Sequence, residues 1–252
     1  MDIFGLPRFG LLVPPENPVA EPEFMQLLGS EMNVYTTRFP VTKEFTRETM
    51  EMYNKVLPEV LSTFGQLRLD AAVVACNASH YLLGPAGDRE FLAELSERFG
   101  FPVRSSSQAI LDLLSAIGTE RLTLVTPYAP WLTDISRSFW EQAGLTVNEV
   151  IVTPAGPQPR DEDQHFNPYL VTTETILDRV RAAELPEDET VLFTGTGMAT
   201  LTAVAELARE DDRRTLLTSN AASAWWARRT AGVTDGEGTH PLIRRLGRLA
   251  TH

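Results

Sequence analysis

Short runs of apolar and β-branched residues alternate with longer helical patterns along almost the whole of this 252-residue chain. Such alternation is typical of parallel sheets whose two faces are covered by helices, so we expect an α/β fold. The predicted strands lie at residues 9–13, 34–39, 71–75, 103–105, 122–126, 147–153, 191–194 and 215–218. The predicted helices between them lie at residues 46–64, 88–99, 108–117, 133–143, 172–183, 199–209 and 221–231.

Two short matches indicate that the chain contains two related halves. Residues 12–14 (Leu-Val-Pro) resemble residues 125–127 (Val-Thr-Pro), an offset of 127 − 14 = 113 residues. Residues 106–109 (Ser-Ser-Gln-Ala) resemble residues 218–221 (Thr-Ser-Asn-Ala), an offset of 218 − 106 = 112 residues. A duplicated βα unit predicts two similar lobes related by a pseudo-twofold axis, with the active site between the carboxyl ends of their strands.

The predicted lobes divide the chain near a glycine that follows a helical run. Lobe one takes residues 1–118 and lobe two takes residues 119–233. Residues 234–252 form a C-terminal tail, which either adds a short helix that completes lobe one or stays mobile. Residues 154–168, rich in Pro and Asp, are predicted to be a loop.

The lone cysteine, Cys76, follows the first lobe's apolar run 71–75 and precedes the small polar run Asn77-Ala78-Ser79. This is the join of a buried strand to a helix N-terminus, where free N–H groups lower a thiol pKa and bind anionic oxygens. We therefore expect a reactive thiol beside a carboxylate-binding site. The structural alternative is that Cys76 is a small buried hydrophobic residue. In lobe two the equivalent position is Gly195.

Composition excludes several classes of partner. The chain has a formal charge of −12 and no basic run, so we expect neither nucleic acid nor a membrane surface as a partner. No segment is long and apolar enough for a membrane span, and we expect a cytoplasmic protein.

The four histidines lack metal-ligand spacing, and the run Gly195-Thr-Gly197 lacks the third glycine of a dinucleotide fingerprint. We therefore predict no metal and no cofactor.

Four stretches carry a resemblance to a known family. They are LVPPENPVAEPEF (12–24), ACNASHYLLGP (75–85), LVTPYAPW (124–131) and VLFTGTGMATL (191–201). In sequence and order they resemble the maleate cis–trans isomerase and arylmalonate decarboxylase branch of the Asp/Glu racemase superfamily. The resemblance implies a cofactor-independent enzyme with two similar α/β lobes and a small carboxylic acid as substrate. It leaves a homo-oligomer open.

The resemblance also implies roles for particular residues. Cys76 takes the place of the isomerase nucleophile, and Asn17 and Tyr128 take the places of substrate carboxylate ligands, with Asn167 as a further binding asparagine. Asn17 in a Pro-rich turn is equally typical of a helix cap. The family's second cysteine is replaced here by Gly195, so neither a two-thiol racemase mechanism nor the decarboxylase thiol of lobe two is available.

Three hypotheses for the function are compatible with a single thiol in the site. In the first, the Cys76 thiolate adds to the alkene of a maleate-like dicarboxylate, the resulting single bond rotates, and the thiolate is expelled. The backbone N–H groups of Thr196 and Gly197 would stabilise the enediolate-like intermediate. In the second, Cys76 protonates an enediolate formed by decarboxylation or racemisation of a malonate-like or α-substituted acid. In the third, the chain binds carboxylates without catalysis. We expect His80, four residues after Cys76, to be a surface residue or to act behind the site.

Overall fold

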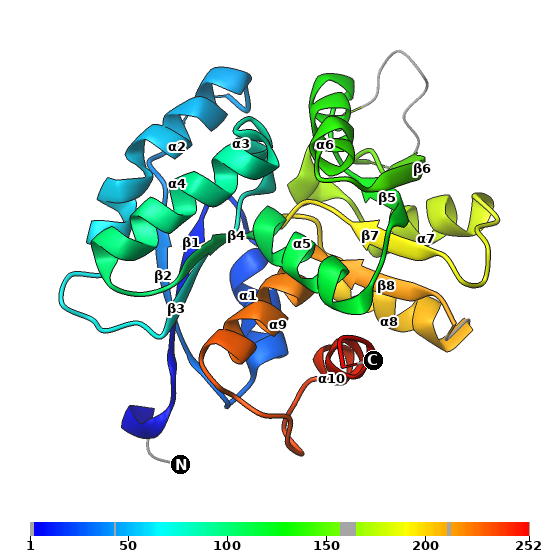
Figure 1. The fold of residues 1–252 in the computed structure, drawn as a ribbon. Coiled ribbons are helices and arrows are strands. Elements are labelled where there is room, and N and C mark those ends of the chain that lie inside the picture. Colours follow the sequence, from blue (N-terminus) through cyan, green and yellow to red (C-terminus); the bar gives the residue numbers. More distant parts are fainter. Residues whose placement is uncertain (1–2, 43, 157–164, 211–212, 252) are drawn as a thin grey trace.

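The computed structural model describes residues 3–42, 44–156, 165–210 and 213–251, and contains two parallel four-stranded sheets side by side (Figure 1). The first sheet has the order β2-β1-β3-β4 and the second has the order β6-β5-β7-β8. The expected α/β fold with two similar halves is confirmed. The strands are β1 (Arg8–Val13), β2 (Asn33–Arg38), β3 (Ala71–Val74), β4 (Val103–Ser105), β5 (Arg121–Thr126), β6 (Thr146–Val152), β7 (Thr190–Phe193) and β8 (Thr215–Thr218).

Helices follow the strands and cover the sheets. Side-chain oxygens of Thr46 and Thr172 accept N–H groups at the starts of α2 and α7. Gly100 and Gly118 end α4 and α5 in the left-handed conformation, as glycines after helices do. The helices are α1 (Ala20–Leu28), α2 (Arg47–Ser62), α3 (Asn77–Tyr81), α4 (Gly84–Phe99), α5 (Ser106–Ile117), α6 (Pro130–Gln142), α7 (Thr173–Ala182), α8 (Leu201–Glu210), α9 (Ser219–Thr230) and α10 (Pro241–Leu249), with short 3-10 turns η1 (Ile3–Gly5) and η2 (Pro168–Leu170).

Strand register fixes which residues of the two halves are equivalent. Leu12 of β1 pairs with Val74 of β3, and Val125 of β5 pairs with Phe193 of β7. Two residues beyond Val74 and Phe193, Cys76 and Gly195 therefore occupy the same place in the two sheets. The predicted equivalence of residues 106–109 to residues 218–221, which rested on a sequence match, is wrong by one residue.

The equivalent residues in that second match are Ser105 and Thr218. Each ends the fourth strand of its sheet and accepts an N–H of the following helix through its side-chain oxygen, Ser105 from Gln108 and Thr218 from Ala221. The offset is 218 − 105 = 113 residues, which is the value given by residues 14 and 127. The same offset therefore relates the first and fourth strands of the two halves, whereas the equivalent residues Cys76 and Gly195 differ by 195 − 76 = 119 residues.

The helices after these two strands pack on each other between the sheets (Figure 1). The Ser223 hydroxyl of α9 donates a 3.1 Å hydrogen bond to the Ser106 hydroxyl of α5, and α9 also packs on α1. Because α9 follows the second sheet in sequence but packs on helices of the first, the predicted lobe boundaries at residues 118 and 233 stay a prediction.

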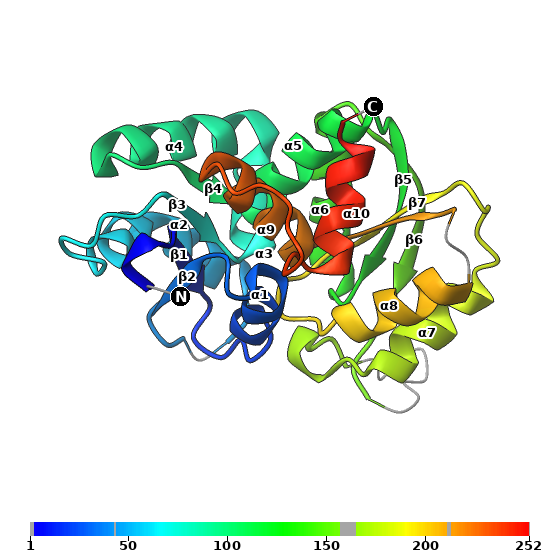
Figure 2. The same ribbon diagram turned by 90° about the horizontal axis from the view of Figure 1, so that it is seen from below.

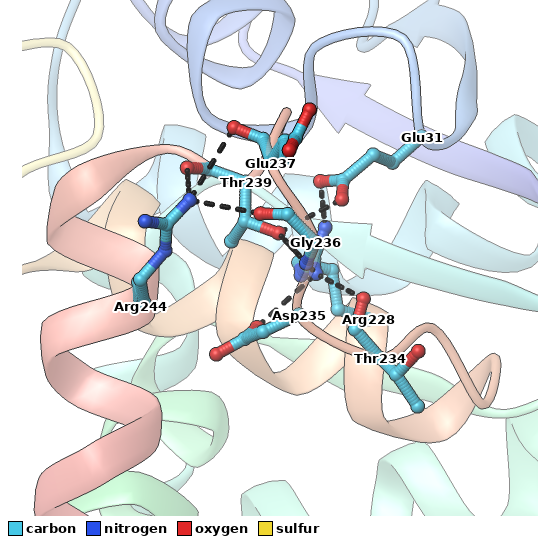
Figure 3. Close-up of polar contacts among 8 residues, drawn as sticks. All are labelled: Glu31, Arg228, Thr234, Asp235, Gly236, Glu237, Thr239 and Arg244. Carbon is cyan, nitrogen blue, oxygen red and sulfur yellow. Dashed lines mark hydrogen bonds and ion pairs between the residues drawn. The ribbon is translucent and has the colours of Figure 1, made fainter.

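The C-terminal segment is held by a buried arginine (Figure 3). Arg228 of α9, 2% exposed, is paired with Glu31 and Asp235 and donates to the carbonyl oxygen of Thr234. The Thr239 hydroxyl donates a 2.8 Å hydrogen bond to Glu31. Figure 2 shows α10 beside α9, near the middle of the molecule, so the tail adds a helix. Among the described helices, none is long and apolar enough to cross a membrane.

Candidate active site

The predicted site residues, with one exception, line a single narrow cavity. It lies at the carboxyl ends of β1, β3, β5 and β7, which are the two central strands of each sheet. Each strand contributes the residues that follow it, so the parallel topology brings together four segments that are distant in sequence. The lining residues are Pro14, Asn17, Phe45, Cys76, Asn77, Ala78, Tyr128, Pro168, Tyr169, Gly195, Thr196 and Gly197.

Cys76 lies between β3 and α3, at the position predicted for it, and is 4% exposed. Burial raises the pKa of its thiol, and the Ser79 hydroxyl and the N–H groups of Ser79 and Ala78 only partly oppose that rise. The expected low pKa is therefore wrong. Helix α3 has only five residues, and its dipole does not compensate for removing a thiolate from water.

The loops that follow β3 and β7 are in direct contact. The Thr196 hydroxyl donates a 2.6 Å hydrogen bond to the carbonyl oxygen of Ala75, the residue before Cys76. The Asn17 amide donates to the Thr196 hydroxyl at 3.3 Å, while its Oδ1 accepts the N–H groups of Val19 and Ala20. Asn17 thus caps the start of α1 with one end of its side chain and faces the cavity with the other.

Gly195, opposite Cys76, has a backbone that disfavours a side chain. Its φ of 94° lies in the left-handed region, and an added Cβ would lie 3.1 Å from Pro127 Cγ and 3.4 Å from the Tyr128 hydroxyl oxygen. The phenol of Tyr128 therefore lies beside the place where a second thiol would begin. Burial raises the Tyr128 pKa well above its ordinary value, which keeps the hydroxyl protonated as a hydrogen-bond donor.

The Asn77 side chain joins the first-sheet loop to α9. Its amide donates to the Ser219 hydroxyl at 2.9 Å and to the Tyr81 hydroxyl at 3.1 Å. Burial raises the pKa of Tyr81 to about 12. Because these contacts use the Asn77 amide N–H groups, the backbone N–H of Asn77 is the donor left for an anionic ligand, whereas the Ala78 N–H is directed at the Cys76 thiol.

Tyr169, which no sequence pattern indicated, covers the cavity. An added Cβ at Gly197 would lie 2.3 Å from Tyr169 Cε1, so the tyrosine ring rests on the glycine. Asn167 holds this turn, since its Oδ1 accepts the Tyr169 N–H at 3.0 Å. Asn167 lines a second, outer cavity that shares Phe45, Pro168 and Tyr169 with the inner one. No periodicity marks Tyr169, although its Asn-Pro turn is visible in the sequence.

His80 lies behind the site, without surface exposure. Its Nδ1 is 2.7 Å from Oδ1 of Asp88, and Asp88 Oδ2 accepts a 2.7 Å hydrogen bond from the Ser105 hydroxyl. Both His80 and Asp88 are fully buried, so the interpretation of His80 as a surface residue is wrong. His80 is absent from the described cavity lining.

The cavity offers hydrogen-bond donors without formal charge. No Lys, Arg, His, Asp or Glu is among the described residues that line it. An anionic ligand there would be bound by backbone N–H groups, the Asn17 amide and the hydroxyls of Tyr128 and Tyr169, because the Thr196 hydroxyl hydrogen is donated to Ala75. Within the described residues, no group of three or more His, Cys, Asp or Glu side chains is placed to hold a metal ion.

Fold and site define a two-sheet α/β protein with a cysteine at a cavity between related halves. The family model for arylmalonate decarboxylase matches residues 9–241, so the chain belongs to this family. It is 27% identical over 203 residues to the arylmalonate decarboxylase of Bordetella bronchiseptica, covering 79% of this chain and 80% of that protein. It is 25% identical over 154 residues to the maleate isomerase of Nocardia farcinica, covering 58% of this chain and 61% of that enzyme.

Solved structures of both enzymes share the fold. A Nocardia farcinica maleate cis–trans isomerase mutant with a covalently bound succinylcysteine intermediate has a TM-score of 0.81 at 21% identity, covering 96% of this chain and 99% of that chain. Unliganded arylmalonate decarboxylase has a TM-score of 0.71 at 22% identity, covering 95% of this chain and 99% of that chain. The resemblance noted in the sequence is thereby confirmed.

Proposed function

We propose that this protein is a cofactor-independent isomerase of a small unsaturated dicarboxylate, with Cys76 as its nucleophile. The observation that carries the proposal is the position of the thiol. Cys76 lines the same cavity as Thr196 and Gly197, which come from the other half of the molecule. A planar diacid between the two loops would have the sulfur on one side and N–H donors on the other.

The reaction needs no co-reactant. The Cys76 thiolate forms a bond to one alkene carbon, and the π electrons move onto the adjacent carboxylate as an enediolate. Rotation about the new single bond and expulsion of the thiolate then give the trans acid. The N–H groups of Thr196 and Gly197 and the Tyr128 hydroxyl would stabilise the enediolate, by about 3–4 kcal/mol for each well-placed donor.

The relatives support this assignment. The isomerase mutant from Nocardia farcinica carries a succinylcysteine, which is the product expected when a cysteine adds to a four-carbon enedioate. The size of the inner cavity also favours a small acid, because Tyr169 rests on Gly197 and leaves little width for an aromatic substituent.

The raised pKa of Cys76 favours a second candidate, decarboxylation or racemisation of a malonate-like or α-substituted acid. In decarboxylation the bond to one carboxylate breaks, CO₂ leaves, and the electron pair stays on the remaining acid as an enediolate. Cys76 gives its proton to that carbon and regains one from water. A buried thiol that keeps its proton at neutral pH suits this role.

Product analysis separates the candidates. The purified chain is incubated with maleate, with other cis-enedioates and with alkyl- and arylmalonates, and products are followed by NMR and by CO₂ release. Formation of fumarate, abolished by Cys76→Ala, supports the isomerase. CO₂ release with loss of activity in the same variant supports the decarboxylase instead. Binding of these acids without turnover of any of them would overturn both and indicate a non-catalytic carboxylate-binding protein.

A further inference from the structure

A buried carboxylate from α1 contacts the segment that forms the second-half face of the cavity. Glu23 is 5% exposed and lies on the helix that Asn17 caps. Its Oε1 accepts the backbone N–H groups of Thr200 at 2.7 Å and Leu201 at 3.1 Å. These N–H groups lie at the start of α8, where a negative charge is favourable.

The same carboxylate reaches the other end of the segment through one amide. Glu23 Oε2 accepts a 2.8 Å hydrogen bond from Asn220 Nδ2, and that nitrogen also donates to the carbonyl oxygen of Thr196 at 3.1 Å. Residues 196 and 200 are therefore tied to one side chain. Gly197 lies between them, and its N–H group is one of the donors that the proposed function assigns to the substrate.

We propose that Glu23 is a positioning residue that holds the loop of residues 195–201 against Cys76. The role rests on the proposed function, because the loop is expected to supply donors to the substrate. The loop needs such support because Gly195 has a left-handed backbone and no side chain of its own. An error of a few tenths of an ångström in this loop would weaken hydrogen bonds to a developing oxyanion.

Only a carboxylate satisfies all of these donors. Its two oxygens are acceptors, and both hydrogens of Asn220 Nδ2 are used, one toward Glu23 and one toward Thr196. A glutamine at position 23 would present its own NH₂ either to Asn220 or to the Thr200 and Leu201 N–H groups. Burial raises the pKa of Glu23, while the hydrogen bonds from Asn220, Thr200 and Leu201 lower it.

The test compares Glu23→Gln with Glu94→Gln, which makes the same change of charge at an exposed position of α4. Residue-resolved amide hydrogen exchange is measured by NMR. We expect exchange at Thr200 and Leu201 to be at least about tenfold faster in E23Q, with the strands unchanged, and no change in E94Q. Unchanged exchange at Thr200 and Leu201 in E23Q would overturn the proposal.

Turnover gives a readout that a purely structural role would not move. With the acid that the product analysis shows to be turned over, we expect kcat of E23Q to fall at least about tenfold while KM changes less than about threefold. Faster exchange with an unchanged kcat would overturn the positioning role. If the wild-type chain turns over none of the acids, the proposed function fails, and the exchange rates alone decide whether Glu23 holds the loop.

Asn220→Ala keeps the test decisive if E23Q does not fold. This variant removes both hydrogen bonds of the Asn220 amide, to Glu23 Oε2 and to the Thr196 carbonyl oxygen, and leaves the bonds from Thr200 and Leu201 to Glu23 Oε1 in place. Exchange should become faster at Met198, whose N–H bonds to Gly195 within the loop, and stay slow at Thr200 and Leu201. Exchange at Met198 as slow as in the wild-type chain would count against the proposal.

Discussion

The hydroxyl of Thr196 donates a 2.6 Å hydrogen bond to the carbonyl oxygen of Ala75. These residues follow the equivalent strands β7 and β3, so the bond joins the two halves of the molecule at the cavity. Ala75 precedes Cys76, and Thr196 precedes Gly197. The position of the thiol relative to the opposing backbone is therefore set by direct contact between the two loops, in addition to the packing of the sheets.

Thr196→Val removes this hydroxyl at nearly constant volume. The buried Ala75 oxygen and the Asn17 amide would both lose a partner, and we expect unfolding free energy to fall by about 1–3 kcal/mol. Urea unfolding measures the change. Thr196→Ser, which keeps the hydroxyl, is the control. Equal stability of the two variants would contradict the assignment.

The pH dependence of turnover distinguishes the two candidate reactions. Burial raises the pKa of Cys76 above its ordinary value of 9.0. If the thiolate is the nucleophile, the rate should rise about tenfold per pH unit from neutral pH and level off only above pH 9. If the neutral thiol is the proton donor, the rate should be constant near neutral pH and fall above the same pKa.

Alkylation provides an independent measure of this pKa, because Cys76 is the lone cysteine of the chain. The rate of reaction with iodoacetamide follows the thiolate, so its midpoint should lie above pH 9. A midpoint below pH 8 would show that the helix N-terminus outweighs burial. The turnover profile and the alkylation midpoint should then shift together.

The sequence was sufficient for the strands and for most of the cavity lining, for identifiable reasons. Buried parallel strands are short apolar runs, and the residues that follow the central strands must meet at one edge of the fold. Helix α1 was not predicted, because Pro18 and Pro22 obscure its period. Pro22 is tolerated there, since an N–H in the first turn of a helix has no partner within the helix.

Two properties of the site depend on packing and could not be predicted from the chain alone. The thiol pKa is set by how completely the surrounding segments exclude water, and local sequence around Cys76 indicates only the helix N-terminus. Tyr169 reaches the cavity because its loop folds back over Gly197, a contact between residues of different elements that no spacing rule describes. Asn167, placed in the outer cavity, stays a prediction as a ligand.

Gly197→Ala tests the contact that closes the inner cavity. The added methyl would lie 2.3 Å from Tyr169 Cε1, so the ring must move. We expect a loss of about 1–3 kcal/mol in stability from this overpacking, together with faster alkylation of Cys76. In the Tyr169→Ala background the same substitution should cost less than about 0.5 kcal/mol. Additive effects of the two substitutions would show that the residues do not touch in solution.

Arg228→Met tests whether the C-terminal segment is part of the fold that supports the site. Arg228 is 2% exposed, and its loss would leave Glu31 with the Thr239 hydroxyl but without a cation, and would remove the arginine donor to the carbonyl oxygen of Thr234. Removing one member of a buried ion pair costs about 3–5 kcal/mol, and the value here should be near 3 because Glu31 is partly exposed. Thermal and urea unfolding measure it, with the exposed Arg248→Met as the control.

The same variant tests the connection between the tail and the site, because α9 carries both Arg228 and the site contacts Ser219 and Asn220. In folded R228M, Cys76 should react faster with iodoacetamide. Unchanged stability and unchanged reactivity would show that the tail does not support the site.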